Sequence, residues 1–300
     1  MADADSSYDL AQAPRFLDEL RKGRDLVQGC RLPSGGGRIL PGAMPRLHRW
    51  WDNPMFSWLA RLWFHAPVHD IHCGMRAFTR ELFDRLGLQC TGMEFASEMI
   101  IKATLSGARI GEIPITLSPD GRRAHAPHLR TFRDGWRHLR FFLVFSPRWL
   151  YLLPGVALMV AGIAGYAVAF PRRTIVGVTF DVHTMLVASL ALIVGFQSVL
   201  FAVMTKVFSI AEGLLPEDLW LQRIVRRFGL EKALLAGALL SIAGLALLAL
   251  SVEEWRVAHF GPLDYSRTMR RLIPGVTLTA LGVQTVLSSF FLSILGMKRR

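Results

Sequence analysis

Four long apolar runs occupy the second half of the chain and limit its fold more than any other feature. They lie at residues 149–170, 184–206, 233–252 and 272–296. Each run has about 20 or more residues, the length that an α-helix needs to cross about 30 Å of hydrocarbon. A soluble protein of 300 residues rarely buries four such segments, so we expect four transmembrane helices.

Basic residues beside these runs predict the orientation in the membrane. Arginines are frequent before the first run, and the chain ends in Lys298, Arg299 and Arg300. Four spans put both ends on one side, and the positive-inside rule places that side in the cytoplasm, as in a bacterial inner membrane. The loop at 207–232 is also basic and agrees. The arginines of the loop at 253–271 would lie outside, and they conflict with this orientation.

The composition agrees with a membrane protein whose polar part faces a reducing compartment. The net charge is +12, yet 52% of the residues are hydrophobic. A basic cytoplasmic face explains this combination better than nucleic-acid binding, and we expect no nucleic-acid partner. The three cysteines, Cys30, Cys73 and Cys90, are widely spaced and form no C-x-x-C motif, which argues against a disulfide framework or a zinc site.

A basic and aromatic segment at 129–148 comes directly before the first run. Two sets of residues recur there at spacings of three and four: Arg130, Arg133, Arg137 and Arg140, and Phe132, Trp136, Leu139 and Leu143. Each set follows one side of a helix, and the two sides differ. We therefore expect an amphipathic helix that lies in the membrane interface. A soluble helix with a solvated basic face is the alternative.

Residues 77–118 have α/β character. Thr79 is a suitable N-cap for a helix in "TRELFDRLGL", and Gly107 gives a C-cap signal after the helical pattern of "MEFASEMIIKATLSGARI". "RIGEIPITL" then alternates as a strand does, and its Pro114 fits best on an edge strand.

The segment "GCRLPSGGGRILPGAMP" at 29–45 is a loop rich in glycine and proline. Consecutive glycines do not favour a helix or a strand, but they allow backbone N–H groups to approach an anion. Arg31 and Arg38 flank these glycines. The sequence leaves two interpretations open, an anion-binding loop and a connector.

An acidic pair, Asp3 and Asp5, opens the chain. Two carboxylates at i and i+2 at the end of a strand can both reach one divalent cation. Their oxygen ligands suit Mg²⁺ or Mn²⁺, which in turn binds phosphate oxygens. An acid-x-acid triplet is a weak signal by itself, because an exposed turn would explain it equally well.

The order of the motifs is more specific than any one of them. "ADADSSYD" is followed by "RDLVQGCRLPSGGG", "HDIHCGMRAFTRELF" and "EFASEMIIKATLSGARIGEIPI", and then by the arginine-rich segment before the spans. Over residues 2–148 this order resembles the family-2 glycosyltransferases that charge polyprenyl phosphates, such as dolichol-phosphate mannose and glucose synthases. The acid triplet and the D-x-x-x-G-x-R element at Asp70, Gly74 and Arg76 are the sharpest parts of the resemblance.

The resemblance implies a role for each matching residue. Asp3 and Asp5 would bind Mg²⁺ or Mn²⁺, which holds the diphosphate of a nucleotide-sugar. Asp70, Arg76 and Glu98 would form the catalytic element. The residues that would bind substrate, chiefly the acceptor phosphate, are Arg31, Arg49, Arg122 and Arg123.

The resemblance also implies a domain order and a reaction. It implies a partial, Rossmann-like α/β glycosyltransferase domain at 1–128, the interface helix at 129–148, and a four-helix transmembrane domain at 149–300. The reaction would be inverting transfer of a sugar from a nucleotide-sugar to a polyprenyl phosphate at the cytoplasmic face. Family members have a nucleotide-binding half before the acid pair, so we expect the sequence as given to bind the donor poorly.

Two other functions are compatible with the same residues. One is a non-catalytic membrane scaffold or partner subunit that binds lipid phosphate, in which the acid pair is vestigial. The other is a transporter, which the near absence of ionisable residues from the spans disfavours. The sequence does not fix the oligomeric state, and a homo-oligomer stays open.

Overall fold

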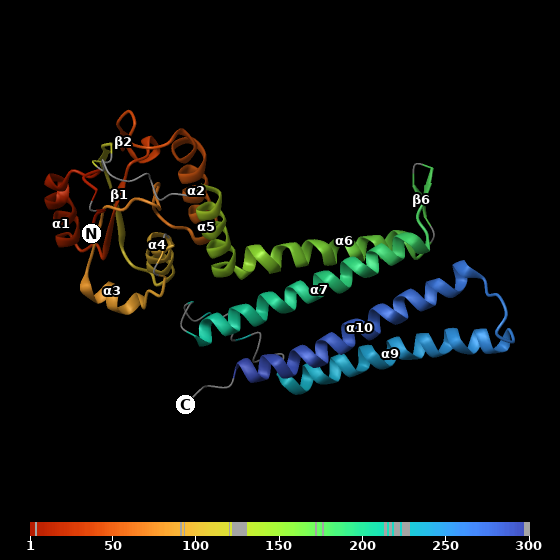
Figure 1. Cartoon of the computed structure of the whole chain (residues 1–300). Coiled ribbons are helices and arrows are strands. Elements are labelled where there is room, and N and C mark those ends of the chain that lie inside the picture. Colours follow the sequence, from red (N-terminus) through yellow and green to blue (C-terminus); the bar gives the residue numbers. More distant parts are fainter. Residues whose placement is uncertain are drawn as a thin grey trace. The chain divides into compact units, whose positions relative to one another are not determined.

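The computed structural model describes residues 1–3, 5–90, 92, 94–119, 121, 131–171, 173–175, 177–212, 215, 218, 223 and 229–296. These residues form two compact units, Met1–Ser146 and Pro147–Arg300, which we call the polar unit and the membrane unit (Figure 1). Each unit is considered by itself.

The polar unit combines short strands with helices. Its helices are η1 (Leu10–Gln12), α1 (Ala13–Arg21), η2 (Pro33–Gly35), η3 (His48–Asp52), α2 (Asn53–Phe64), α3 (Arg80–Leu86), α4 (Phe95–Leu105) and α5 (Thr131–Phe145). Its strands are β1 (Leu26–Cys30), β2 (Arg38–Ile39), β3 (Arg76–Phe78), β4 (Ile110–Pro114) and β5 (Thr116–Leu117). The α/β class expected from the sequence is confirmed.

The main sheet has the order β3-β1-β4. Strand β1 pairs in parallel with β4 and antiparallel with β3. Pro114 ends β4 on an edge strand, as expected, because an edge strand tolerates a missing N–H. The expected cap of α3 is also confirmed, since the Thr79 side chain accepts a hydrogen bond from the N–H of Leu82.

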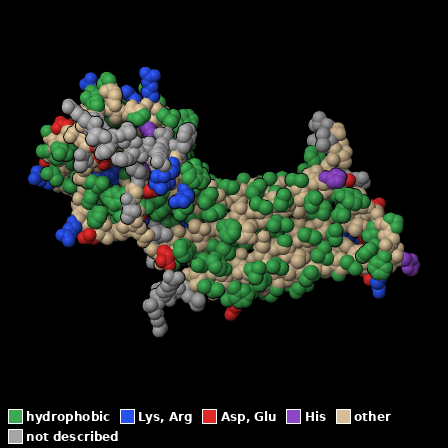
Figure 2. Space-filling view, in the orientation of Figure 1, with side chains coloured by type: hydrophobic (Ala, Val, Ile, Leu, Met, Phe, Trp, Pro, Cys, Tyr) green, Lys and Arg blue, Asp and Glu red, His purple; other side chains and the backbone are tan. Residues whose placement is uncertain are grey.

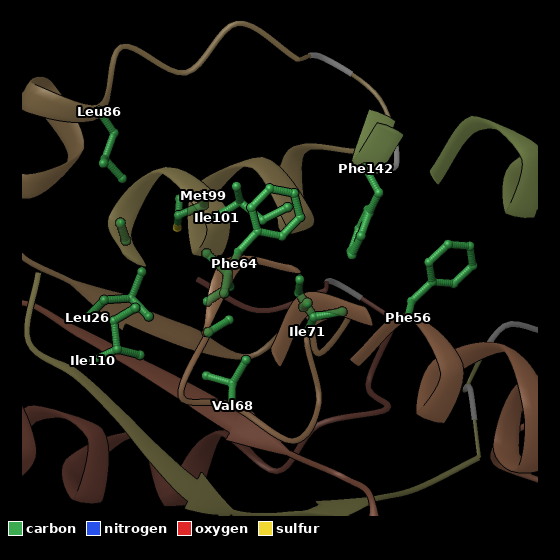
Figure 3. Close-up of a cluster of buried hydrophobic side chains, with 14 of the residues drawn as sticks. Leu26, Phe56, Phe64, Val68, Ile71, Leu86, Met99, Ile101, Ile110 and Phe142 are labelled. Carbon is green, nitrogen blue, oxygen red and sulfur yellow. The ribbon is translucent and has the colours of Figure 1, made fainter. Parts of the chain in front are cut away.

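Strand β1 is buried on both faces and divides two hydrophobic clusters. Leu26 belongs to the larger cluster, formed largely by α2, α4 and α5, whereas Val27 belongs to the smaller one together with Phe16 of α1. Figure 3 shows side chains of the larger cluster, among them Phe56 of α2 and Phe142 of α5. Helices on both sides therefore sandwich the sheet, and its strand ends remain accessible for a site.

Helix α5 corresponds to the amphipathic segment expected before the spans. Its Phe141 and Phe142 are buried in the larger cluster of the polar unit, and the Phe142 ring packs against Phe56 and Phe64 of α2. Trp136 is 60% exposed, on the same side as the exposed Arg133. Phe141 and Phe142, which lie outside the Trp136 set, therefore form the side that packs into the polar unit, and the interface position of this helix stays a prediction.

The membrane unit contains four long apolar helices, so the expected four-span helical part is confirmed. They are Arg148–Ala169 (η4, Arg148–Leu152, continued by α6, Leu153–Ala169), α7 (Val182–Ala211), α9 (Leu230–Val257) and α10 (Tyr265–Leu295). Helix α6 packs on α7, α7 on α10, and α10 on α9. A small hairpin, β6 (Thr174–Ile175) and β7 (Val178–Thr179), joins α6 to α7 and was not predicted. Figure 2 shows hydrophobic side chains covering the visible surface of these helices.

Small residues form the contacts between paired helices. A Cβ atom on Gly155 of α6 would lie 2.8 Å from the carbonyl oxygen of Gly195 in α7. Likewise, a Cβ atom on Gly244 of α9 would lie 2.7 Å from the carbonyl oxygen of Gly275 in α10. Close backbone approach is the usual basis of helix association in a bilayer, where burial of apolar surface provides no driving force.

Candidate active site

The N-terminal segment bonds to β3 and to the end of β5, and it brings Asp3 to the predicted catalytic loop. Met1 and Arg76 exchange backbone hydrogen bonds at the start of β3, with N–O distances of 2.9 and 3.0 Å. Further along, the Ser118 N–H donates to the carbonyl oxygen of Ser7, and Tyr8 forms an antiparallel bridge with Leu117. Hydrogen bonds and a β-bridge therefore hold Met1, Ser7 and Tyr8 against neighbouring segments of the polar unit.

Asp3 lies directly against Gly74 of the D-x-x-x-G-x-R element. A Cβ atom built on Gly74 would be 2.3 Å from Oδ2 of Asp3, so only glycine leaves room for the carboxylate in this position. Asp3 is an exposed residue, and both of its carboxylate oxygens lie close to Gly74. The structure thus brings the first acid of the pair to the loop of Asp70 and Arg76.

Asp5 is half-buried and held by its neighbours. Its Oδ1 accepts hydrogen bonds from the backbone N–H of Ser7, at 3.1 Å, and from the Ser7 hydroxyl. Its carbonyl oxygen accepts from the N–H of Gly121 at 3.0 Å. The second carboxylate of the pair is therefore on an ordered turn.

Binding of one divalent cation by Asp3 and Asp5 stays a prediction, in which the cation would take its other ligands from substrate and water. Among the described residues, no group of three or more His, Cys, Asp or Glu side chains is arranged to hold a metal ion. Mg²⁺ commonly binds through one or two carboxylates plus phosphate oxygens and waters. The exposed carboxylate of Asp3 matches that mode, whereas a closed all-protein metal cage does not form in this part of the chain.

Asp70 and Arg31 form a buried ion pair at the carboxyl end of β1. Arg31 Nε lies 2.7 Å from Asp70 Oδ2 and Arg31 Nη2 lies 2.9 Å from Oδ1, while the Arg31 backbone N–H also donates to Oδ2. Burial disfavours the charged guanidinium, but the Asp70 carboxylate outweighs it and raises the pKa of Arg31 above its usual range. The guanidinium of Arg31 is therefore charged in this contact. Asp70 holds Arg31 in place, and its oxygens are committed to that contact.

Arg76 places a second positive charge beneath the same loop. Its side chain is buried, with Nη1 donating to the carbonyl oxygen of Ala96 at 3.0 Å and Nη2 donating to that of Cys73 at 2.5 Å. Burial lowers its pKa, and none of the ion pairs within the described residues includes Arg76. A buried cation that lacks a carboxylate partner attracts anions to the surface above it.

The contacts of Glu98 within the described residues do not include Asp70. Its carboxylate is buried, pairs with Lys102 at 2.8 Å and accepts from the N–H groups of Gln89 and Cys90. Burial opposes ionisation, yet these bonds lower the pKa of Glu98 below its usual value. This geometry favours a positioning role for Glu98, because it fixes the turn before α4, which carries the Ala96 partner of Arg76.

The residues expected to bind acceptor phosphate are only partly placed. Arg31 is paired with Asp70, as described above. Arg49 lies on η3, half-buried, with its guanidinium 5.4 Å from the Trp50 ring centroid and its Nε buried without a hydrogen-bond partner. Arg122 and Arg123 lie outside the described residues.

The glycine-rich loop packs against the end of β1. A Cβ atom on Gly37 would lie 2.2 Å from the carbonyl oxygen of Cys30, and one on Gly35 would lie 2.4 Å from Cys30 Sγ. Gly36 has a positive φ of 81°. Close packing accounts for these glycines, and it excludes a loose connector over 35–37.

Sequence reasoning assigned no site role to two groups that contact the loop. The hydroxyl of Tyr8 accepts a hydrogen bond from Gly74 N–H at 3.0 Å. His72 Nδ1 lies 3.0 Å from Asn53 Oδ1, and the His72 ring centroid is 4.4 Å from that of His138 on α5. Burial, with nearby His138 and Arg31, holds the pKa of His72 well below its usual range. Neither group had a spacing signal, because both contacts join segments far apart in the sequence.

Comparisons with known proteins found a family that matches part of the membrane unit and a relative that matches almost the whole chain. Residues 203–296 match the family described as the glycosyltransferase family 2 C-terminal transmembrane region. The chain is 35% identical over 299 residues to a low-salt glycan biosynthesis hexosyltransferase of Haloferax volcanii, covering 99% of the chain and 70% of that relative. It is 37% identical over 134 residues to a dolichyl-phosphate hexose transferase of the same organism. It is 29% identical over 124 residues to a polyprenol monophosphomannose synthase of Mycolicibacterium smegmatis.

The shorter matches cover only part of each protein. They span 44% of this chain and 54% of the dolichyl-phosphate relative, and 39% of this chain and 43% of the polyprenol relative. The chain therefore spans about half the length of these two relatives.

Proposed function

Because the chain belongs to the family-2 glycosyltransferases of the polyprenyl-phosphate type, we propose that it transfers a sugar from a nucleotide-sugar to a polyprenyl phosphate at the cytoplasmic membrane face. The relatives are named for hexosyl transfer, in two cases with a dolichyl phosphate or a polyprenol. The four apolar helices suit such an acceptor, since its isoprenoid tail stays in the bilayer.

One observation carries this proposal: Asp3 lies against Gly74, in the loop that also holds Asp70 and Arg76. A carboxylate for a cation, an anchored Arg31 and a buried Arg76 thereby share one end of the sheet. That combination suits two phosphate-bearing substrates, whose mutual repulsion is the main obstacle to reaction.

In this proposal, each charged residue of the site has its own role. Asp3 and Asp5 would hold Mg²⁺ or Mn²⁺, which supplies positive charge to the leaving diphosphate. Arg76 adds fixed positive charge, and Asp70 pairs with Arg31 and keeps its guanidinium in place. The acceptor phosphate, with a second pKa of about 6, is already ionised near neutral pH, so no side chain needs to remove its proton. Its direct attack on the anomeric carbon would invert the configuration there.

The test is metal-dependent transfer in membranes that contain the full-length protein. We expect Asp5→Asn to reduce sugar transfer to polyprenyl phosphate by more than about 100-fold, since one charged ligand of the cation is lost. Asp9→Asn is the matched control, because Asp9 is exposed and its Oδ1 caps η1 through the N–H of Ala11. Full activity of Asp5→Asn would defeat the metal assignment. Binding of lipid phosphate with no transfer by the unaltered protein would favour a scaffold instead.

A further inference from the structure

Tyr8 connects the acid-pair segment to the predicted catalytic loop. The residue is 6% exposed, its side chain packs in the smaller hydrophobic cluster, and its backbone bridges Leu117. Its hydroxyl emerges from that cluster at the loop, where Oη accepts from Gly74 N–H at 3.0 Å and lies 4.0 Å from Cys73 Sγ. The ring therefore anchors Tyr8 in the core, while the hydroxyl reaches the site.

Gly74 has two neighbours from the same N-terminal segment. Its N–H is bound by Tyr8, and its Cα faces the carboxylate of Asp3. Asp3 and Tyr8 lie five positions apart, on either side of Asp5. A shift of the loop away from the Tyr8 hydroxyl would consequently move Gly74 away from the Asp3 carboxylate as well.

We propose that Tyr8 is a positioning residue that holds the loop of Asp70, Gly74 and Arg76 in register with the cation-binding carboxylates Asp3 and Asp5. This inference rests on the proposed function, in which the acid pair binds a divalent cation and the loop orders Arg31 and Arg76. The hydroxyl is the active part, because phenylalanine would fill the same space in the cluster but would leave the Gly74 N–H without its partner.

The test compares Tyr8→Phe with the unaltered full-length protein by Mn²⁺ binding, followed as loss of the electron paramagnetic resonance signal of free Mn²⁺. We expect Mn²⁺ affinity to fall about fivefold, the effect of losing one buried hydrogen bond on the alignment of the carboxylates. In the transfer assay we expect kcat to fall and the KM for polyprenyl phosphate to stay unchanged. A merely structural tyrosine would lower thermal stability without changing the Mn²⁺ affinity.

Tyr166→Phe is the matched control. Tyr166 lies in the membrane unit, and its hydroxyl lies 2.5 Å from the Ser189 hydroxyl and 3.1 Å from that of Thr277. It therefore loses a comparable hydrogen-bonded hydroxyl, and we expect its Mn²⁺ affinity to equal that of the unaltered protein.

The outcomes separate this inference from the proposed function. Equal Mn²⁺ affinity in Tyr8→Phe and the unaltered protein overturns the role of Tyr8, whether or not sugar is transferred. Weaker Mn²⁺ binding in Tyr8→Phe, combined with no transfer by the unaltered protein, supports the role of Tyr8 and overturns the proposed function.

A second measurement applies if Tyr8→Phe does not fold. We expect the Gly74 amide of the unaltered protein to be protected from hydrogen exchange, because it is bonded to the Tyr8 hydroxyl. Exchange as fast as that of an exposed amide would overturn the proposal without any variant.

Discussion

At the scale of single residues, Gly74 offers the sharpest probe of the site. Its missing side chain makes room for Asp3, and the three atoms that a Cβ at this position would meet first all belong to the Asp3 carboxyl group. Because Asp3 is an exposed side chain, it can move aside when a methyl group is added, and the fold should persist. Gly74→Ala therefore separates the position of the carboxylate from stability.

We expect Gly74→Ala to reduce sugar transfer by about 10- to 100-fold, the usual cost of misplacing a group at a reacting centre. Its unfolding temperature should stay close to that of the unaltered protein. Gly111→Ala is the control, since a Cβ atom there meets its nearest neighbour, Arg24 Cγ, at an ordinary 3.4 Å. Equal activity of the two variants would mean that Asp3 does not act beside Gly74.

The sequence predicted residue types at the site better than their partners. The motifs named Asp3, Asp70, Arg31 and Arg76, and the structure gathers these around one loop. The sequence did not indicate that Asp70 neutralises Arg31, because that ion pair joins residues 39 positions apart. Nor did it indicate Tyr8, since a buried aromatic residue has the same sequence signature whether or not its hydroxyl reaches a site.

At the scale of elements, α5 shows what periodicity can and cannot predict. The spacing of arginines and apolar residues predicted a helix, and α5 spans Thr131–Phe145. Which side faces the core depends on neighbours that are distant in sequence, here Phe56 and Phe64 of α2. The two-residue strands β2, β6 and β7 escaped prediction for a related reason, because two residues show no alternation.

The contact between α5 and the catalytic loop should depend on pH. The ring of His72 in the loop lies against that of His138 in α5 at a tilt of 45°, and Arg31, Arg76 and His48 also contribute positive charge near it. The folded pKa of His72 is depressed, whereas an unfolded histidine titrates near 6.5. Below that pH the unfolded state binds more protons than the folded state, so the folded state loses stability as the pH falls.

We expect the free energy of unfolding of the polar unit to decrease below about pH 6.5, by at most about 1.4 kcal/mol per pH unit for this one proton. His72→Gln should flatten the decrease, because glutamine retains a donor for Asn53 Oδ1 and does not titrate. Urea unfolding at pH 5.5 and 7.5 measures the effect. An identical pH dependence in both proteins would exclude His72 as its source.

At the scale of the whole molecule, the arginines around the connection between α9 and α10 bear on the predicted orientation. The sequence placed Arg256, Arg267, Arg270 and Arg271 in an outer loop, against the positive-inside rule. Helix α9 ends at Val257 and helix α10 begins at Tyr265, so the connection between them is only residues 258–264, shorter than the expected loop at 253–271. All four arginines have acidic partners: Arg256 pairs with Glu253, Arg267 and Arg271 with Glu254, and Arg270 with Asp181.

We still expect the polar unit to lie in the cytoplasm, and cysteine labelling tests this orientation. We expect a membrane-impermeant maleimide to label Pro262→Cys in intact cells, because Pro262 is exposed in the connection between α9 and α10. Ser34→Cys, exposed in the polar unit, should be labelled only after permeabilisation. Background labelling should be slow, because burial raises the pKa of the native Cys73 thiol to about 12 and that of Cys90 to about 11. The reverse labelling pattern would place the polar unit outside, where a cytoplasmic nucleotide-sugar could not reach Asp3 and Asp5.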